Sequence, residues 1–186
     1  EDELLAIIAV KDRLKATASG VVKELRGQGL DICMLTGDGE RTASAIAGKL
    51  GIIRYMSDAQ PEDKEAFIRE LRLQGKKVVM VGDGVNDSPA LGLADVGLAM
   101  GGGSDIAKEV ADIILTDTDL AAIVRLRRMS QGLIDRLSSS YSKVMLTNSA
   151  LLALGITGMI TPQTSSLLHN GSTIAYSLGN AKAYLR

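Results

Sequence analysis

Short apolar runs alternate with stretches of helical periodicity along the first two thirds of the chain. The apolar runs are continuous, as is typical of parallel strands that are buried on both faces. The stretches between them repeat apolar residues every three or four positions, which favours amphipathic helices. This pattern predicts strands at 4–10, 31–35, 52–56, 77–81, 96–100 and 111–115, and helices at 17–28, 40–50, 61–74 and 104–110.

The regular alternation of strands and helices predicts an α/β fold, with a parallel sheet that helices cover on both faces. In such a sheet the carboxyl ends of the strands meet at one edge, and ligands bind there. Thr36 follows the strand at 31–35, and Asp83 follows the strand at 77–81. We therefore expect both residues at the same edge of the sheet, where the active site would lie.

From Asp119 onward the pattern changes to one long helix, followed by a stretch without charged side chains apart from any charge on a histidine. Residues 144–181 contain no Asp, Glu, Lys or Arg, which leaves room for two membrane crossings of about 20 residues each. Thr161 and Pro162 divide this stretch. We expect a two-helix transmembrane hairpin in the lipid bilayer. The alternative is a buried hairpin in a soluble protein, because the second helix is rich in Ser, Thr, Asn and Gln.

The charge and cysteine content narrow the class of protein. A net charge of −1, without a basic stripe interleaved with aromatic residues, argues against a nucleic-acid partner. The single cysteine excludes a disulfide framework. Basic residues flank both ends of the charge-free stretch, among them Lys143 and Lys182. This distribution places both ends on the cytoplasmic side of a membrane.

The most restricted stretch is the loop at 82–87, with the sequence Gly-Asp-Gly-Val-Asn-Asp. It follows a predicted strand and precedes Ser88-Pro89, which begins like a helix. The two glycines allow a tight bend, and two carboxylates with one asparagine lie within six residues. Such a set of hard oxygen ligands suits Mg²⁺ and a phosphate group.

Three motifs in sequence order carry a resemblance to a known family. They are Thr36-Gly37-Asp38, then Pro61-Glu62-Asp63-Lys64, and then the loop at 82–87. Together they resemble P-type ATPases of the haloacid-dehalogenase-like (HAD-like) superfamily and, within these, the heavy-metal-transporting branch. Further agreement comes from Lys11-Asp12 and from the stretches at 94–101 and 111–113.

The resemblance implies an organisation for the whole chain. Residues 1–118 would form part of a phosphorylation domain with a HAD-like Rossmannoid sheet, and residues 119–143 a stalk helix. Residues 144–181 would form two transmembrane helices, and residues 182–186 a cytoplasmic tail. The protein would be the C-terminal part of an ATP-driven pump for a heavy or transition-metal cation. It would be a multi-pass protein of the plasma or inner membrane, with its catalytic domain in the cytoplasm.

The resemblance also implies roles for individual residues of the site. Thr36 and Gly37 would hold the transferred phosphoryl group, and Asp38 would lie toward the ATP. Lys64 would neutralise the charge that develops on the phosphoryl group. The remaining roles concern Mg²⁺, which Asp83 would bind, while Asn86 and Asp87 would complete the shell around Mg²⁺, phosphate and lysine.

The chain departs from the family pattern because it contains no Asp-Lys-Thr-Gly-Thr motif, which carries the phosphorylated aspartate. The resemblance therefore implies an N-terminal portion, outside this chain, that supplies this motif and binds ATP. Without it the chain would neither form an aspartyl phosphate nor transport a cation. The alternatives are a soluble phosphatase of the same superfamily, with a nucleophile in Asp117-Thr118-Asp119, and a non-catalytic remnant of a pump.

His169 is the only histidine and lies in the middle of the second expected membrane helix. An ionisable residue at that depth suggests a functional site, and a neutral imidazole suits Zn, Cu, Fe or Ni. His169 is therefore a candidate ligand of the transported metal, which could be monovalent or divalent. The alternative is a hydrogen bond between helices. The chain matches neither the copper-type nor the zinc-type pattern of membrane ligands, so the metal stays open.

Overall fold

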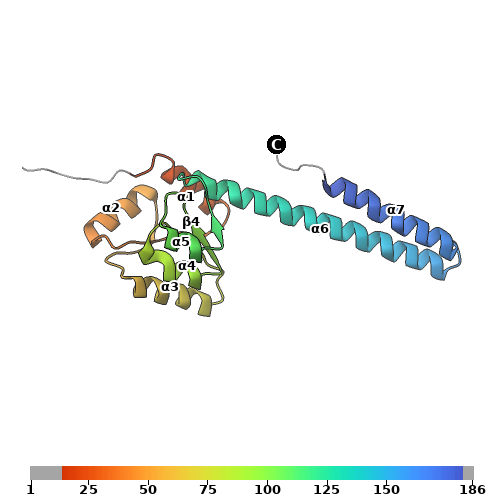
Figure 1. Cartoon of the computed structure of the whole chain (residues 1–186), viewed down its shortest axis with the longest axis horizontal. Coiled ribbons are helices and arrows are strands. Elements are labelled where there is room, and N and C mark those ends of the chain that lie inside the picture. Colours follow the sequence, from red (N-terminus) through yellow and green to blue (C-terminus); the bar gives the residue numbers. More distant parts are fainter. Residues whose placement is uncertain (1–13, 182–186) are drawn as a thin grey trace, which may run out of the picture. The chain divides into compact units, whose positions relative to one another are not determined.

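The computed structural model describes residues 14–181, so the predicted strand at 4–10, Lys11-Asp12 and the tail at 182–186 lie outside the described residues. The elements follow the predicted order of strands and helices (Figure 1). They are α1 (Ala18–Gly27), β1 (Cys33–Leu35), α2 (Glu40–Leu50), β2 (Arg54–Met56), α3 (Pro61–Leu73), β3 (Val79–Gly82), the 3₁₀ turn η1 (Val85–Asp87), α4 (Ser88–Leu93), β4 (Val96–Ala99), α5 (Asp105–Val110), β5 (Ile113–Ile114), α6 (Ala121–Ile156) and α7 (Pro162–Ala181).

Local sequence signals set the ends of the helices that lead into the candidate site. α2 ends at Gly51, whose φ of 70° lies in the left-handed region that glycine adopts without strain. α3 begins with Pro61, and the backbone N–H of Gln60 donates to Asp63 Oδ2 over 2.9 Å as part of a capping box. α5 begins after Ser104, whose Oγ accepts a hydrogen bond from the N–H of Ala107.

All strand pairs of the described residues are parallel, but they form two sheets instead of the single predicted one. β1 pairs with β2, and a separate sheet has the order β3-β4-β5. The prediction of one continuous sheet is therefore wrong for residues 14–181. The physical reason is that no described strand hydrogen-bonds to both β1 and β3. The strands are also shorter than predicted: β1 and β2 lack the first two predicted residues, and β5 has two residues only.

Helices pack on both sheets and enclose two small apolar cores. In one core, Val22 of α1 and Ala47 of α2 lie against Ile52, which precedes β2. In the other, Val21 and Leu25 of α1 pack on the first turn of α6. α4 contacts β3 and β4, and α5 contacts β4. Ile68 of α3, Leu91 of α4 and Leu98 of β4 are the largest side chains that are almost fully buried.

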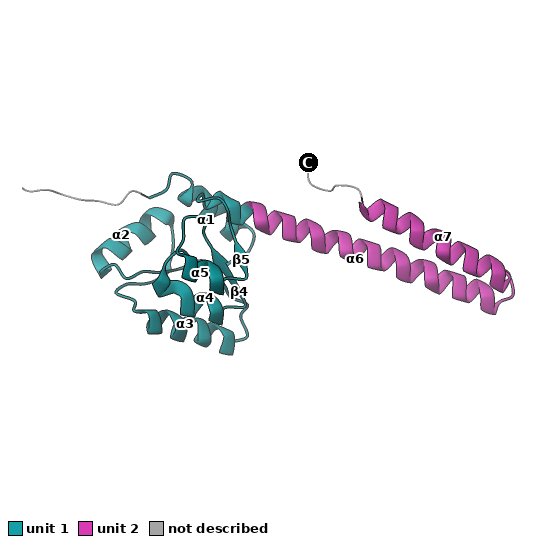
Figure 2. Cartoon of the chain, in the orientation of Figure 1, with its two compact units in different colours: residues 1–124 teal, residues 125–186 magenta. Residues whose placement is uncertain are grey.

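The chain divides into two compact units, Glu1–Val124 and Arg125–Arg186 (Figure 2). The second unit is an α-helical hairpin, in which α7 returns along α6. Polar side chains join the two helices along their length. The hydrogen bonds run from Arg136 to the carbonyl of Gly179, from Ser140 to Asn180, between Thr147 and Tyr176, and between Asn148 and His169, over 2.6–2.9 Å.

The expectation of two membrane crossings at 144–181 does not agree with the properties of α6 and α7. Within residues 14–181, no helix combines the length and the apolar character that a membrane crossing requires. The uncharged part of α6, from Val144 to Ile156, is shorter than the ~20 residues that span a bilayer core. In α7, polar residues recur along the whole helix: Gln163, Thr164, Ser165, Ser166, His169, Asn170, Ser172, Thr173, Ser177 and Asn180. The absence of charge in this stretch therefore does not amount to sufficient hydrophobicity.

Candidate functional site

The loop at 82–87 continues directly from β3 and folds back on itself. Gly82 is required at the bend, because a Cβ atom there would lie 2.7 Å from the Cβ of Asp87. The 3₁₀ turn η1 then brings Asp87 under the loop, and α4 follows with Pro89 in its first turn. Asp83 and Asn86 are exposed, whereas Asp87 is half-buried. The loop thus presents one carboxylate and one amide to solvent and turns the other carboxylate inward.

Lys64 and Asp87 form a buried ion pair beneath this loop. Lys64 Nζ lies 2.7 Å from Asp87 Oδ1, and Lys64 is only 9% exposed. The other oxygen, Asp87 Oδ2, accepts the backbone N–H groups of Asp83 and Gly84 over 3.4 Å each. Both oxygens of Asp87 therefore have protein partners. The geometry suits a residue that orients Lys64 and the loop more than one that binds a metal ion itself.

The side chains of Asp83 and Asn86 have a different environment. Within residues 14–181, the carboxylate of Asp83 and the amide of Asn86 take part in no hydrogen bond or ion pair. The backbone of Asp83 is nevertheless held, because its carbonyl accepts the N–H of Ser104 over 2.8 Å. The backbone of Asp83 is thus fixed, its carboxylate oxygens are free, and its N–H is bonded to Asp87, the partner of Lys64.

The loop at 36–38 forms a second polar cluster after β1. Thr36 Oγ1 donates to Asp38 Oδ2 over 3.0 Å and accepts the backbone N–H of Asp38 over 3.1 Å, while Gly37 is exposed. The loop at 57–60 closes on it: Ala59 donates its N–H to the carbonyl of Thr36 over 2.9 Å, and Asp58 donates to the carbonyl of Asp38 over 2.8 Å. Asp58 has a φ of 50°, which is unusual for a residue with a side chain.

The two clusters are linked through α3. The loop at 57–60, which closes on Thr36 and Asp38, runs directly into α3, and α3 carries Lys64 in its first turns. Both clusters follow parallel strands at their carboxyl ends. No hydrogen bond or ion pair of the described residues joins Thr36 or Asp38 directly to the loop at 82–87. The structure therefore contains two polar clusters, each with its own internal hydrogen bonds, which α3 connects through the chain.

The oxygen donors of the site fit Mg²⁺ and do not form a closed metal cage. Residues 14–181 contain no group of three or more His, Cys, Asp or Glu side chains that could enclose a metal ion. Mg²⁺ commonly uses one or two carboxylates together with phosphate oxygens and water. Asp83, with free oxygens in an exposed position, meets this requirement. The donor set thus fits Mg²⁺ that a phosphate group helps to hold.

Comparison with protein families gives a match to the haloacid dehalogenase-like hydrolases over residues 1–95, which is more than half of the chain. The chain belongs to this family. Both polar clusters and Lys64 lie within the matched residues.

Known proteins similar to this HAD-like chain are heavy-metal-transporting P-type ATPases, which are cation-translocating ATP hydrolases. A copper-transporting P-type ATPase of Rhizobium leguminosarum bv. viciae is 51% identical over 129 residues, or 69% of this chain and 15% of the relative. A manganese-exporting P-type ATPase of Mycobacterium tuberculosis (strain CDC 1551 / Oshkosh) is 38% identical over 174 residues, or 92% of this chain and 24% of the relative.

A solved structure extends the similarity to three dimensions. A zinc-transporting PIB-type ATPase in its E2.Pi state matches with a TM-score of 0.84 and 33% sequence identity. The match covers 90% of this chain and 28% of that structure. The matched part of this chain also spans only about a quarter or less of the length of the two relatives named above.

Asp117 and Asp119, at the two ends of the segment 117–119, form hydrogen bonds with neighbouring groups of the same unit. Asp119 donates its N–H to Asp117 Oδ1 over 2.9 Å, and Asp119 Oδ1 accepts the N–H of Ala121, the first residue of α6. Asp119 Oδ1 also accepts the hydroxyl of Thr17 over 2.6 Å. This arrangement is typical of a carboxylate that begins a helix. It does not favour Asp117-Thr118-Asp119 as the nucleophile of a soluble phosphatase.

Glu40 is a polar contact near the site that the sequence did not indicate. Its carboxylate accepts the hydroxyl of Tyr55 and the hydroxyl of Ser57, each over 2.7 Å. These two hydrogen bonds, with that of Tyr55 the stronger influence, lower the pKa of Glu40. Glu40 thereby joins the start of α2 to the loop that closes on Thr36. Its place directly after Gly39 was the available signal, since acidic residues favour the first turn of a helix.

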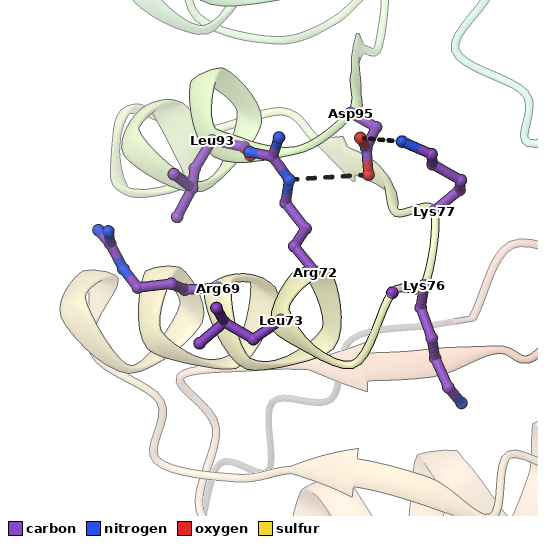
Figure 3. A pocket seen from close by; sticks show the side chains of 8 residues that line it. Arg69, Arg72, Leu73, Lys76, Lys77, Leu93 and Asp95 are labelled. Carbon is purple, nitrogen blue, oxygen red and sulfur yellow. Dashed lines mark hydrogen bonds and ion pairs between the residues drawn. The ribbon is translucent and has the colours of Figure 1, made fainter.

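A cavity of about 350 Å³ near the end of α3 is lined by none of the residues of this site (Figure 3). Two of the cations that line it are paired with Asp95, which lies 3.2 Å from Lys77 Nζ and 3.8 Å from Arg72 Nε. The pKa of Asp95 is lowered, first by the N–H of Val78 and then by Lys77. The cavity is thus a region where ion pairs join α3, β3 and β4.

His169 lies on α7 of the helical hairpin, where its Nδ1 is 2.9 Å from Asn148 Oδ1 on α6. Ser172 and Thr173 donate their hydroxyls to the carbonyl of His169. This arrangement fits the alternative in which the histidine joins two helices. His169 has no second His, Cys, Asp or Glu ligand in a candidate metal group of the described residues.

Proposed function

We propose that this chain supplies the C-terminal part of the phosphorylation domain of an ATP-driven heavy or transition-metal cation pump. Asp83 binds Mg²⁺ together with the phosphoryl group, and Lys64 neutralises charge on that group. Thr36 and Gly37 hold the phosphoryl oxygens, and Asp38 lies on the side of the ATP. Asn86 contributes its exposed amide, while Asp87 keeps Lys64 in position.

The single observation that carries this proposal is the ion pair between Lys64 and Asp87 below the loop whose Asp83 carboxylate has no partner among the described residues. A buried ammonium group is costly unless it is paired, so its retention at a loop after a parallel strand points to a use for the charge. Phosphoryl transfer requires such a fixed cation next to Mg²⁺ and little other chemistry from the protein. The similarity to P-type ATPases over 92% of the chain supports the same assignment.

The nucleophile is proposed to enter with a strand that this chain does not contain. β1 has a hydrogen-bonded neighbour only in β2, and β3 only in β4, among the described strands. Val79 of β3 is 57% exposed. Asp31 and Lys76, which precede β1 and β3, are joined by an ion pair of 3.3 Å. The proposed strand would pair with the edges of β1 and β3 that have no neighbour among the described strands. The N-terminal portion of the pump would supply it, with the phosphorylated aspartate at its end.

The transported cation and the location follow from the same proposal. The relatives named above export or transport manganese, copper or zinc, so the family alone selects no single metal. His169 stays a candidate contact of the cation, although its hydrogen bond to Asn148 gives it another role. The intact pump would act at the plasma or inner membrane, with the unit that contains Asp83 in the cytoplasm.

The experiment that tests the proposal combines the chain with a separately produced polypeptide that carries the Asp-Lys-Thr-Gly-Thr motif. Acid-stable incorporation of the γ-phosphate of ATP is measured with and without Mg²⁺. We expect phosphorylation only when both parts are present, and loss of at least 100-fold for Asp83→Asn, since the metal ion stabilises the transferred group. Asp105→Asn is the matched control, because Asp105 is an exposed carboxylate of α5.

The rival soluble phosphatase predicts a different outcome for the chain alone. Such an enzyme would hydrolyse p-nitrophenyl phosphate with Mg²⁺ and without any added polypeptide. We expect no hydrolysis above that of the Asp83→Asn variant. Mg²⁺-dependent turnover by the isolated chain, abolished by Asp117→Asn, would replace the pump proposal with the phosphatase.

A further inference from the structure

The glycine-rich loop between β4 and α5 lies directly against the backbone of the candidate Mg²⁺ site. Met100 donates its N–H to the carbonyl of Gly82 over 3.1 Å. Ser104 donates its N–H to the carbonyl of Asp83 over 2.8 Å. The loop at 101–103 therefore runs between two hydrogen bonds that both end on the strand-to-loop junction of the site.

Gly103 has no space for a side chain at this point. A Cβ atom on Gly103 would lie 2.9 Å from the carbonyl oxygen of Asp83, 2.9 Å from that of Met100 and 3.1 Å from the Cα of Asp83. These neighbours are backbone atoms, which cannot rotate away as a side chain does. The adjacent Gly102 is different, because it is exposed and its Cβ would meet only the Thr118 methyl group at 3.4 Å.

We propose that Gly103 and Ser104 are positioning residues that fix Asp83 relative to the Lys64–Asp87 pair. The inference rests on the proposed function, in which Asp83 binds Mg²⁺. The N–H of Asp83 is bonded to Asp87 Oδ2, and its carbonyl is bonded to the N–H of Ser104. The Asp83 residue is thus held from both sides, while its carboxylate has no partner in the described residues.

Ser104 has two separable roles in this arrangement. Its Oγ accepts the N–H of Ala107 over 3.2 Å and so caps α5, whereas its own N–H holds Asp83. Ser104→Ala removes the cap and keeps the N–H. Ser104→Pro removes both, and the φ of −61° at this position is one that proline adopts. Comparison of these two variants isolates the hydrogen bond to Asp83 from the stability of α5.

The proposal is tested with the full chain, with Mn²⁺ as a paramagnetic substitute for Mg²⁺. Broadening of backbone amide signals near Asp83 gives the Mn²⁺ concentration for half effect. Amide hydrogen exchange at Ser104 and at Leu98 of β4 is measured on the same samples without metal. The Mn²⁺ titration reports the metal site, the exchange at Ser104 reports the hydrogen bond to Asp83, and the exchange at Leu98 reports whether the unit stays folded.

We expect Gly103→Ala and Ser104→Pro to raise the Mn²⁺ concentration for half effect at least tenfold, because a small misplacement of a ligand has large effects. For Ser104→Pro the Mn²⁺ titration and the exchange at Leu98 are compared with those of Ser104→Ala. Gly102→Ala and Ser104→Ala are expected to titrate within twofold of the unchanged chain. Gly103→Ala also loses the exchange protection of the Ser104 amide while Leu98 stays protected.

The outcomes test the positioning role of Gly103, the hydrogen bond of Ser104 and the proposed Mg²⁺ site separately. If Gly103→Ala titrates like Gly102→Ala and keeps the Ser104 amide protected, the positioning role is wrong. If Ser104→Pro titrates like Ser104→Ala, the hydrogen bond to Asp83 has no such role, and this holds even if Gly103→Ala fails to fold. If Asp83→Asn titrates like the unchanged chain, the proposed Mg²⁺ site is wrong, whatever the amide exchange shows.

Discussion

Replacement of Lys64 by methionine tests the energetic core of the site. The pair to Asp87 is 2.7 Å long, and the two side chains are 11% and 16% exposed. Without Lys64, the Asp87 carboxylate keeps only two backbone N–H donors at 3.4 Å, which are weak hydrogen bonds. Breaking a buried ion pair by removal of one partner costs about 3–5 kcal/mol. Because both side chains keep some exposure to solvent, the lower end of this range applies, and we expect Lys64→Met to lower the free energy of unfolding by about 3 kcal/mol.

The double variant Lys64→Met, Asp87→Asn removes both charges, while the asparagine oxygen can still accept the two N–H groups. It should recover about 2 kcal/mol of the loss, and measurement of Asp87→Asn alone completes the cycle that gives the coupling energy between the two positions. Lys108→Met is the matched control, because it breaks the more exposed pair to Asp105 at 3.6 Å and should cost at most about 0.5 kcal/mol.

Native-state hydrogen exchange at the amides of β4 measures these free energies in the full chain. This assay follows the unit that contains the pair and does not require both units to unfold together. A loss below about 1 kcal/mol for Lys64→Met, equal to that of the Lys108 control, would refute the argument. It would mean that Asp87 finds other partners and that Lys64 is not fixed.

Three further predictions concern other parts of the chain. Gly51→Ala should destabilise the fold by about 1 kcal/mol, because Gly51 has a left-handed φ. Gly48→Ala, on the exposed face of α2, should stabilise the fold by up to about 1 kcal/mol. Thermal unfolding compares the two variants. Because the pKa of Asp95 is lowered in the folded protein, its charge stabilises the fold at pH values above the ordinary pKa of 3.8, and this stabilisation is lost as the pH falls through the lower folded pKa. Asp95→Asn should therefore make the free energy of unfolding less dependent on pH in the acid range. His169→Ala and Asn148→Ala should each cost the hairpin about 1 kcal/mol, and the double variant little more than either one, as measured by amide exchange in α6 and α7.

Local signals allowed most elements to be predicted from the sequence. α2 was predicted at its observed bounds because Ala43, Ile46, Ala47 and Leu50 repeat at helical spacing and Gly51 ends it. α3 begins at the predicted proline, Pro61. The single sheet was wrong because strand pairing depends on residues far apart in sequence, and no described strand lies between β1 and β3. No helix of residues 14–181 has the length and apolar character of the expected membrane crossings, because uncharged polar residues, to which the expectation gave too little weight, recur along α7.

The candidate site was predictable where side-chain identity carries the signal. Lys64 and Asp87 are 23 residues apart, and only the resemblance to P-type ATPases brought them together before the structure did. The contact of Ser104 with Asp83 could not be predicted, because it joins two backbone groups and any residue other than proline supplies the N–H. Glu40 was missed for a related reason, since its partners Tyr55 and Ser57 form no known motif with it.

The most direct test of the central claim places this chain in a working pump. The corresponding 129-residue segment of the copper-transporting P-type ATPase of Rhizobium leguminosarum bv. viciae is replaced by that of this chain. Mg²⁺-dependent formation of an acid-stable phosphoenzyme from ATP is then measured, with the unmodified relative as reference. We predict phosphorylation within about tenfold of the reference, and its loss by at least 100-fold on Asp83→Asn but not on Asp105→Asn. A folded chimera whose phosphorylation is unaffected by Asp83→Asn would contradict the account.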